Sequence, residues 1–213
     1  MDSVIEIKRM SDLAETERDI RTEMALVFID GYYEKLQAIT KDKEKLILLF
    51  KDSFEESTFY LATMEEKVIG IAACADNKKR AITLDKELFV KHLGMIKGKI
   101  VYKALEKEFH GQLTRYEDTS AYIECVATLM EARGKGVATK LMETMVRKAP
   151  YKDFKLYVED TNKGAYSIYK KLGFKEFDRI KATFWEKKFF KAKIYMKIGK
   201  LELKNKPPQE QGL

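Results

Sequence analysis

The sequence predicts one α/β domain, in which a central mixed and twisted sheet of about six or seven strands is flanked by helices. Three observations predict this class. Two apolar, β-branched runs separated by a short polar stretch in the first half are typical of an antiparallel hairpin. Strand-like and helix-like segments alternate in the second half, which is typical of a βαβ unit. With 213 residues, 45 % hydrophobic and 35 % charged, the chain suits one globular core.

The elements of the first half are predicted from the spacing of apolar residues. Residues 4–9 alternate as a strand does, and residues 13–39 carry an apolar stripe with helical spacing. A second, shorter helix is predicted over residues 43–50. The hairpin is predicted to pair residues 57–63 with residues 67–75.

A long extra helix is predicted between the third and fourth strands, over residues 85–109, because apolar residues recur there at helical spacing. Gly94 and Gly98 lie four residues apart within it. They either allow a neighbouring segment to pack closely or break the helix. The sequence does not assign a role to this helix.

The second half is predicted to alternate strands and helices and to end in a polar tail. Residues 205–213 contain paired prolines and are expected to be disordered, so that the domain covers residues 1–204. The predicted strands are 121–128, 154–158, 174–180 and 192–203, and the predicted helices are 135–148 and 162–172.

The composition of the chain indicates the cellular compartment and the kinds of partner that are expected. No run approaches the roughly eighteen apolar residues that cross a bilayer, and the N-terminal segment lacks the apolar stretch of a signal peptide. A cytoplasmic protein without a membrane partner is therefore expected, with Cys74 and Cys125 as buried, reduced thiols. Two His and two Cys at unrelated spacings form no metal signature, so no metal is expected.

The net charge of +7 raises the question of a nucleic-acid partner. Most lysines are interleaved with acids, which is typical of solvated helix faces. Only residues 181–193 mix cations with aromatic side chains, and that pattern is more typical of a terminal strand packed on a core. A nucleic-acid partner is therefore not expected, whereas a homodimer stays open.

A turn with two glycines joins the strand 121–128 to the next helix. Unpaired N–H groups at the start of a helix, together with the helix dipole, favour an anion there. Gly136 would let a ligand approach the backbone, and Arg133 and Lys135 add positive charge. By itself the turn could also be an ordinary connection with solvated basic residues. Neither a P-loop nor a dinucleotide fingerprint occurs in the chain.

The run from Arg133 to Ala138 reads R-x-x-G-x-A and resembles the [Q/R]-x-x-G-x-[G/A] signature of the GNAT N-acetyltransferase superfamily. A second block, residues 162–174, resembles the N-x-x-A-x-x-x-Y-x-x-x-G-F segment of the same family, and the likeness covers residues 122–177. The resemblance implies a GNAT-like domain that transfers an acetyl group from acetyl-CoA to a primary amine, by direct attack in a ternary complex. The extra helix is longer than the connection in many relatives, which leaves the substrate side open.

The resemblance also implies which residues bind the cofactor. The turn would hold the pyrophosphate, and the backbone of the preceding strand would bind the pantetheine arm and face the thioester oxygen. Asn162 would bond the pantetheine, cap its helix, or do both. The implied cofactor-binding residues are Val126, Ala127, Thr128, Arg133, Gly134, Lys135, Gly136, Val137, Ala138, Thr139, Asn162 and Tyr169.

Two residues are candidates for catalysis. Tyr169 matches the tyrosine that in many relatives protonates the leaving thiolate. Full transfer from a phenol to a thiolate runs uphill by about 2 kcal/mol at ordinary pKa values, so a hydrogen bond to the thiolate is favoured. The alternative is a packing tyrosine. Glu124 is expected on the strand face of Tyr122 and Val126, either as a base acting through water, in an ion pair with a lysine, or exposed at the strand end.

The acceptor is not identified by these motifs. The resemblance places it between residues 13–50 and residues 184–203, where Asp30, Glu34 and Glu186 could attract a cationic amine. A small-molecule amine and a protein amino group both remain open. The alternative function is a non-catalytic acyl-CoA-binding sensor or a partner-regulating module.

Overall fold

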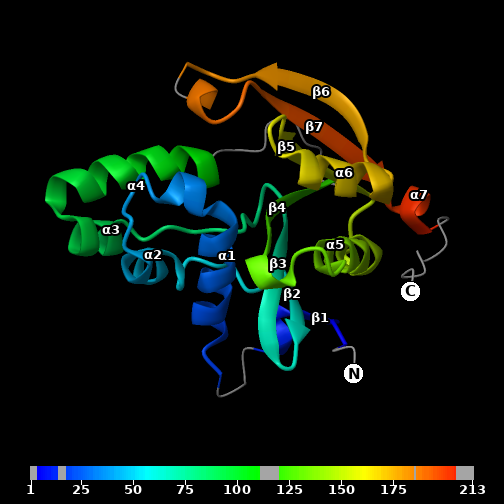
Figure 1. Cartoon of the computed structure of the whole chain (residues 1–213), viewed down its shortest axis with the longest axis horizontal. Coiled ribbons are helices and arrows are strands. Elements are labelled where there is room, and N and C mark those ends of the chain that lie inside the picture. The colour runs from blue at the N-terminus through cyan, green and yellow to red at the C-terminus, as the bar shows by residue number, and fades with distance from the viewer. Residues whose placement is uncertain (1–3, 14–17, 111–119, 185, 205–213) are drawn as a thin grey trace.

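The computed structural model describes residues 4–13, 18–110, 120–184 and 186–204 (Figure 1). Its centre is a seven-stranded sheet in the order β1-β2-β3-β4-β5-β7-β6, which confirms the predicted mixed α/β class. The strands are β1 (Glu6–Arg9), β2 (Phe59–Met64), β3 (Lys67–Ala75), β4 (Ser120–Thr128), β5 (Asp153–Glu159), β6 (Lys175–Lys181) and β7 (Ala192–Gly199). The helices are α1 (Ile20–Leu36), α2 (Lys43–Phe50), α3 (Lys86–Leu93), α4 (Met95–Phe109), α5 (Val137–Lys148), α6 (Lys163–Leu172) and α7 (Lys200–Lys204), with short 3-10 turns η1 (Met10–Asp12), η2 (Met130–Ala132) and η3 (Glu186–Lys188).

The two faces of the sheet are covered by different helices, and each face has its own core. The first core joins α1, α2 and α3 to one face, and the second joins α5 and α6 to the other. Strand β3 is buried along all but its first residue because it lies between both layers. Strands β1 to β4 are antiparallel, β4 and β5 are parallel, and β5, β7 and β6 are antiparallel again.

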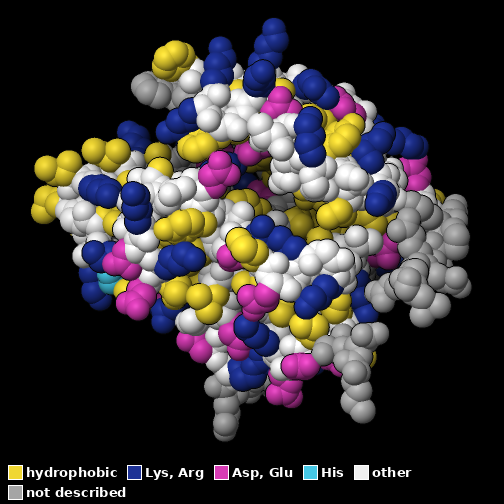
Figure 2. Space-filling model, viewed as in Figure 1, with side chains coloured by type: hydrophobic (Ala, Val, Ile, Leu, Met, Phe, Trp, Pro, Cys, Tyr) yellow, Lys and Arg dark blue, Asp and Glu magenta, His cyan; other side chains and the backbone are white. Residues whose placement is uncertain are grey.

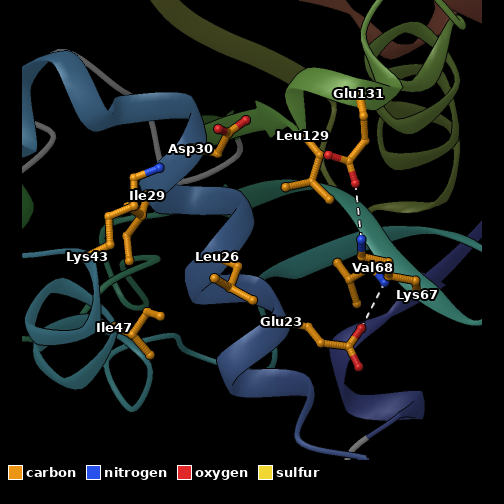
Figure 3. Close-up of a pocket in the computed structure, with 10 residues that line it drawn as sticks. All are labelled: Glu23, Leu26, Ile29, Asp30, Lys43, Ile47, Lys67, Val68, Leu129 and Glu131. Carbon is orange, nitrogen blue, oxygen red and sulfur yellow. Dashed lines mark hydrogen bonds and ion pairs between the residues drawn. The ribbon is translucent and has the colours of Figure 1, made fainter.

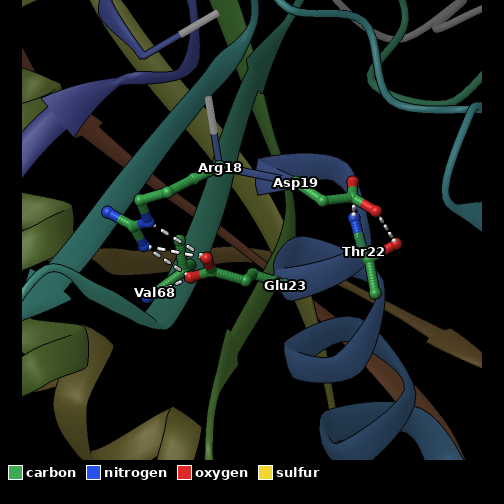
Figure 4. Close-up of polar contacts among 5 residues, drawn as sticks. All are labelled: Arg18, Asp19, Thr22, Glu23 and Val68. Carbon is green, nitrogen blue, oxygen red and sulfur yellow. Dashed lines mark hydrogen bonds and ion pairs between the residues drawn. The ribbon is translucent and has the colours of Figure 1, made fainter. Parts of the chain in front are cut away.

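The predicted helix over residues 13–39 is shorter in the structure. Asp19 caps α1 by accepting the N–H of Thr22 at 3.0 Å, so the helix begins at Ile20 (Figure 4). Beside this cap, Glu23 binds the Arg18 guanidinium and accepts the N–H of Val68 at 2.9 Å, which ties the helix start to β3. Residues 14–17 lie outside the described residues. The second helix and the hairpin are confirmed, and α2 has the predicted bounds.

The predicted long helix is divided at Gly94 into α3 and α4, and its two glycines have different roles. Gly94 has a φ of +84°, which ends one helix and begins the next. At Gly98, an added Cβ would lie 2.4 Å from the carbonyl oxygen of Phe89. One glycine therefore breaks the helix, and the other lets α4 fold back closely on α3. Helix α4 is the predicted long element between β3 and β4.

The prediction of a strand over residues 192–203 is wrong at its end. Strand β7 stops at Gly199, and α7 follows. Glu202 accepts the N–H of Gly199 at 3.3 Å, and Leu203 is buried in the second core, so a helical turn satisfies both the backbone and the apolar side chain. The predicted disordered tail, residues 205–213, lies outside the described residues.

Cys74 and Cys125 are both buried free thiols. Burial raises the pKa of the Cys74 thiol to about 12 and raises that of Cys125 well above its ordinary value. Neither thiol is therefore ionised near neutral pH. Within the described part of the chain, no helix has both the length and the apolar composition needed to cross a membrane.

Candidate functional site

Strands β4 and β5 diverge after a short paired section. Their parallel register covers only Ser120–Tyr122 on β4 and Asp153–Lys155 on β5. Further along, β4 stays paired with β3 and β5 stays paired with β7, so the edges that face each other carry backbone groups that a ligand can bind. In Figure 2 the surface is hollowed between the helices of the first half and β5–β7, with acidic side chains at the rim.

A bulge in β4 lies beside this opening. Ile71 pairs with Ala127 and Ala73 pairs with Glu124, so two residues of β4 oppose one residue of β3. Cys125 takes a φ of +54° at this point. Backbone groups at the bulge thereby leave the regular ladder with β3.

At the bulge, the alternation of side chains between the two faces of the sheet is interrupted in β4. Ile123 lies in the core of α5, whereas Cys125 lies in the core of α1, although residues two apart on a regular strand share a face. Val126 packs against the α5 core, whereas Glu124 pairs with Ala73, whose side chain lies in the core of α1. The expectation that Glu124 and Val126 share a face is therefore wrong, because it assumed regular alternation.

The turn after β4 has the features of an anion site. Gly134 and Gly136 have φ values of +79° and +75°, and an added Cβ at either would meet nothing within 4 Å. Helix α5 begins at Val137, two residues later than predicted, and its N-cap, Gly136, offers no side-chain hydrogen bond. The first-turn N–H groups, which include those of Val137, Ala138 and Thr139, lack that partner and are positioned to bind an anion. Lys135 is exposed beside them.

Arg133 has a structural contact as well as a charge. Its Nε donates to the carbonyl oxygen of Thr128 at 3.2 Å, and its guanidinium lies 3.5 Å from the carboxylate of Asp30. The same carboxylate accepts the N–H of Met130 at 2.8 Å. Asp30, which the sequence offered as an attractor for the amine, thus holds the turn against α1.

Tyr32 is a residue of the site that the sequence analysis did not single out. Its hydroxyl donates to the carbonyl oxygen of Val126 at 3.3 Å, next to the bulge. Burial raises the pKa of this phenol, and the neighbouring Cys125, Tyr169 and Glu124 raise it further. Tyr32 lies within the helix predicted from residues 13–39, but no local signal pointed to its contact with a strand 94 residues away.

Tyr169 lies on α6 and is 7 % exposed, with its ring centroid 5.9 Å from that of Phe174. Burial raises the pKa of its phenol well above the ordinary value, so the hydroxyl keeps its proton and can donate a hydrogen bond. At the start of the same helix, Asn162 accepts the N–H of Ala165 at 3.1 Å. The cap expected of Asn162 is therefore confirmed.

Glu124 is in an ion pair, with an arginine rather than a lysine. One carboxylate oxygen binds the guanidinium of Arg80, and the other accepts the N–H of Ala81 at 3.3 Å. The two charged side chains are only 12 % and 14 % exposed. Burial raises the pKa of Glu124, and the positive charge of Arg80 opposes that rise.

A wall of aromatic rings with charged groups at their edges lies beside the opening. The Tyr157 hydroxyl donates to Glu108 at 3.0 Å, and its ring centroid is 6.4 Å from that of Tyr122 and 5.8 Å from that of Tyr195. The Lys193 ammonium lies 4.9 Å from the centre of the Tyr157 ring. This wall joins α4, β4, β5 and β7, which are far apart in sequence.

Further acids on this side are held by lysines. Glu186, one of the expected acids, binds Lys193 at 2.8 Å, and Glu159 binds Lys35 of α1. Glu34 is exposed. Two of the acids that the sequence offered as attractors for an amine, Asp30 and Glu186, are therefore already in ion pairs.

A separate groove of about 240 Å³ lies on the other side of α1, between that helix, α2, the start of β3 and η2 (Figure 3). Leu26 and Ile47 give it an apolar wall, while Lys67 spans its edge through a 3.1 Å ion pair with Glu131. The groove does not include the candidate catalytic residues. Within the described residues, no cluster of side chains suited to a metal ion occurs.

Three solved structures illustrate the likeness of the fold. An acetyltransferase chimera described as a spermidine N-acetyltransferase from Vibrio cholerae has a TM-score of 0.58 and 14 % identity, with 95 % of this chain and 99 % of that chain covered. The protein PH1933 from Pyrococcus horikoshii has a TM-score of 0.55 and 18 % identity, covering 92 % and 98 %. An N-acetyltransferase from Staphylococcus aureus has a TM-score of 0.53 and 17 % identity, covering 92 % and 100 %. No curated protein sequence matches the chain.

The family assignment rests on a sequence model as well as on the fold. The model of the acetyltransferase (GNAT) family matches residues 21–174, which is more than half of the chain and includes α1, the signature turn and α6. The matched region ends at Phe174, the last residue of the second block found in the sequence. The chain therefore belongs to the acetyltransferase (GNAT) family.

Proposed function

We propose that this protein is an N-acetyltransferase that uses acetyl-CoA and a primary amine. The observation that carries the proposal is the continuous stretch from β4 to α5. It combines an unpaired strand edge, a bulge that removes backbone groups from the regular ladder, and a helix start whose cap supplies no side-chain partner. A long, flexible thioester with a pyrophosphate at one end fits this combination.

The residues of this stretch divide into two binding roles. The backbone of Val126, Ala127 and Thr128 would bind the pantetheine arm along the open edge of β4. The carbonyl of Val126 already accepts the Tyr32 hydroxyl, but a carbonyl oxygen has a second lone pair for a ligand. The pyrophosphate would lie on the α5 amides, where the open space above both glycines admits it. The residues assigned to it are Arg133, Gly134, Lys135, Gly136, Val137, Ala138 and Thr139.

Acetyl-CoA supplies the acyl group, and the protein orients the reaction. The neutral amine attacks the thioester carbon, a C–N bond forms and the C–S bond breaks. The proton that the amine loses passes to water, and the thiolate takes up a proton from water on release. We assign Tyr169 to the departing sulfur, where its buried hydroxyl would stabilise the thiolate by a hydrogen bond. Because burial raises the pKa of Tyr169, complete transfer of its proton is less favourable than the sequence alone suggested.

The role of Glu124 as a base remains a prediction. In the structure both of its oxygens have protein partners, so a water would have to share one of them with Arg80 or Ala81. If Glu124 is the base, the reaction depends on its ionisation, and the pH profile of activity records that dependence.

A non-catalytic acyl-CoA-binding module is the second candidate, and one observation favours it. Glu124, Glu159 and Glu186 all have cationic partners within the chain, which reduces their capacity to act as bases. Such a module would bind acetyl-CoA but release no thiol with any amine.

Two measurements test the proposal together. Acetyl-CoA at about a hundred times its dissociation constant should stabilise the protein by about 2.7 kcal/mol, whereas NAD should not. Release of free thiol is then followed over a panel of small amines and peptides with free amino groups. Thiol release with one class of amine identifies the enzyme and its acceptor. A melting shift without thiol release would favour the binding module, and the absence of any shift would contradict both functions.

A further inference from the structure

The hairpin of α3 and α4 ends in a group of exposed aliphatic side chains. Met95, Ile96 and Ile100 are 67 %, 77 % and 65 % exposed. Ile96 and Ile100 are four residues apart on α4 and therefore share a face, next to Met95. Contiguous exposed apolar groups of this kind indicate an interaction site, because leaving them in water is unfavourable.

The fold of the hairpin shows that this face is not needed for the core. Phe89 of α3 is fully buried, and α4 packs on the core through its opposite side. The packed residues of α4 are Val101, Tyr102, Leu105 and Phe109. In Figure 1 the two helices lie at one extreme of the molecule, and Figure 2 shows hydrophobic and basic side chains together at that extreme. The exposed group is thus on a convex tip.

Charge is segregated along the hairpin. Residues 91–103, which surround the tip, contain four lysines and no acidic residue. The acids of the hairpin, Glu87, Glu106 and Glu108, lie near its base. The tip therefore combines apolar groups with a local positive charge, which complements an anionic surface.

A recess of about 380 Å³ lies along the hairpin, between its base and its tip, and is lined by Lys86, Lys99, Tyr102, Lys103 and Glu106. The carboxylate of Glu106, which lines the recess, already accepts a hydrogen bond from the Tyr102 hydroxyl at 2.9 Å. Three ammonium groups thus surround a space that is large enough for a phosphate. Lys99 and Lys103 share the helix with the exposed isoleucines, so the recess and the apolar group are parts of one surface.

We propose that this tip docks on a lipid bilayer that contains anionic lipids. Met95, Ile96 and Ile100 enter the interface, the surrounding lysines contact headgroups, and the recess holds one headgroup phosphate. A second copy of the chain is a poor partner, since its tip has the same positive charge. The exposed side chains are aliphatic and offer no aromatic platform on which bases could stack, so a nucleic acid is a poorer partner than a bilayer.

The proposal revises one expectation from the sequence. The prediction of no membrane partner considered only spanning segments and signal peptides. Docking by a helical hairpin needs neither, because the helix lies at the interface and the lysine stems extend toward the headgroups. The proposal is independent of acetyl-CoA binding.

The test is co-sedimentation of the full chain with phosphatidylcholine vesicles, with and without phosphatidylglycerol. Binding should be about tenfold or more stronger with the anionic lipid and should weaken with salt. The double variant Ile96→Ser/Ile100→Ser and the double variant Lys99→Gln/Lys103→Gln should each reduce binding by about tenfold or more. Leu201→Ser, at a side chain that is 72 % exposed on α7, and Lys148→Gln on α5 are the matched controls and should bind as the wild type does.

Three outcomes would overturn the proposal. The first is equal sedimentation with neutral and anionic vesicles, and the second is wild-type binding by both double variants. The third is loss of vesicle binding in the lysine variant without any loss in the isoleucine variant. The last outcome would indicate a soluble polyanion instead of a bilayer, and competition by heparin would identify it. Melting temperatures and the acetyl-CoA-induced shift, measured on every variant, separate loss of docking from loss of fold or of the proposed function.

Discussion

The proposed cofactor side of this molecule consists mainly of backbone groups, whereas the proposed acceptor side consists mainly of side chains. From β4 to α5, the candidate site consists of backbone groups: an open strand edge, a bulge and the amides of a helix start. Across the opening, the proposed acceptor side consists of side chains from α1, α4, β4, β5 and β7. The first depends on a short continuous segment, whereas the second exists only when distant segments meet.

This difference has consequences for mutation. A backbone site tolerates many side-chain changes but not a change that alters or covers the backbone. A side-chain site is sensitive to the removal of single polar groups, and the effect is divided among several partners. The following predictions use this contrast, and the largest effect is expected on the cofactor side.

Gly136→Val should weaken acetyl-CoA binding by about a hundredfold, or about 2.8 kcal/mol, because its side chain would occupy the open space above the turn. The backbone there has a φ of +75°, so valine also costs roughly 1–2 kcal/mol of stability. Gly94→Val is the matched control, since Gly94 has a φ of +84° and equally open surroundings but lies between α3 and α4. Calorimetric titration and thermal melting separate the two effects. Equal acetyl-CoA affinity in both variants would contradict the backbone site.

Tyr169→Phe should reduce turnover by about tenfold or more and leave acetyl-CoA affinity unchanged, because it removes one hydroxyl from the departing sulfur and keeps the buried ring. Steady-state kinetics and calorimetric titration provide the two numbers. Tyr166→Phe, on the same helix and only partly buried, is the control. If both variants turn over at the wild-type rate, Tyr169 is a packing residue.

Glu124→Gln should have the smallest effect on affinity and the clearest effect on pH dependence. If Glu124 is the base, activity rises as the pH rises through its pKa, and burial places that limb above the ordinary value of 4.5. The limb should disappear in Glu124→Gln, and in Arg80→Gln it should move to higher pH, because the cation that opposes the effect of burial is lost. The profile of kcat/KM against pH records both shifts. If Glu124→Gln keeps both the turnover and the limb of the wild type, Glu124 is not the base and serves only as the ion-pair partner of Arg80.

How far the fold could be predicted depends on the same contrast between local segments and contacts of distant segments. The hairpin, α2 and the alternating strands and helices of the second half were predicted, because each has a local apolar pattern with its own period. The break at Gly94 and the close approach at Gly98 were both present in the sequence as alternatives. The end of β7 was missed, because Leu203 fits a strand pattern as well as the first turn of a packed helix.

The sequence by itself determined the family motif, the glycine turn and the candidate Tyr169, since these depend on residues that are close together in the chain. Tertiary structure decided the partner of Glu124, which is 44 residues away, and the contact of Tyr32 with Val126. It also decided which face of β4 each side chain occupies, because the bulge arises from pairing with β3. Local patterns record the period of an element, whereas contacts between elements depend on register and packing, for which a single sequence carries no direct signal.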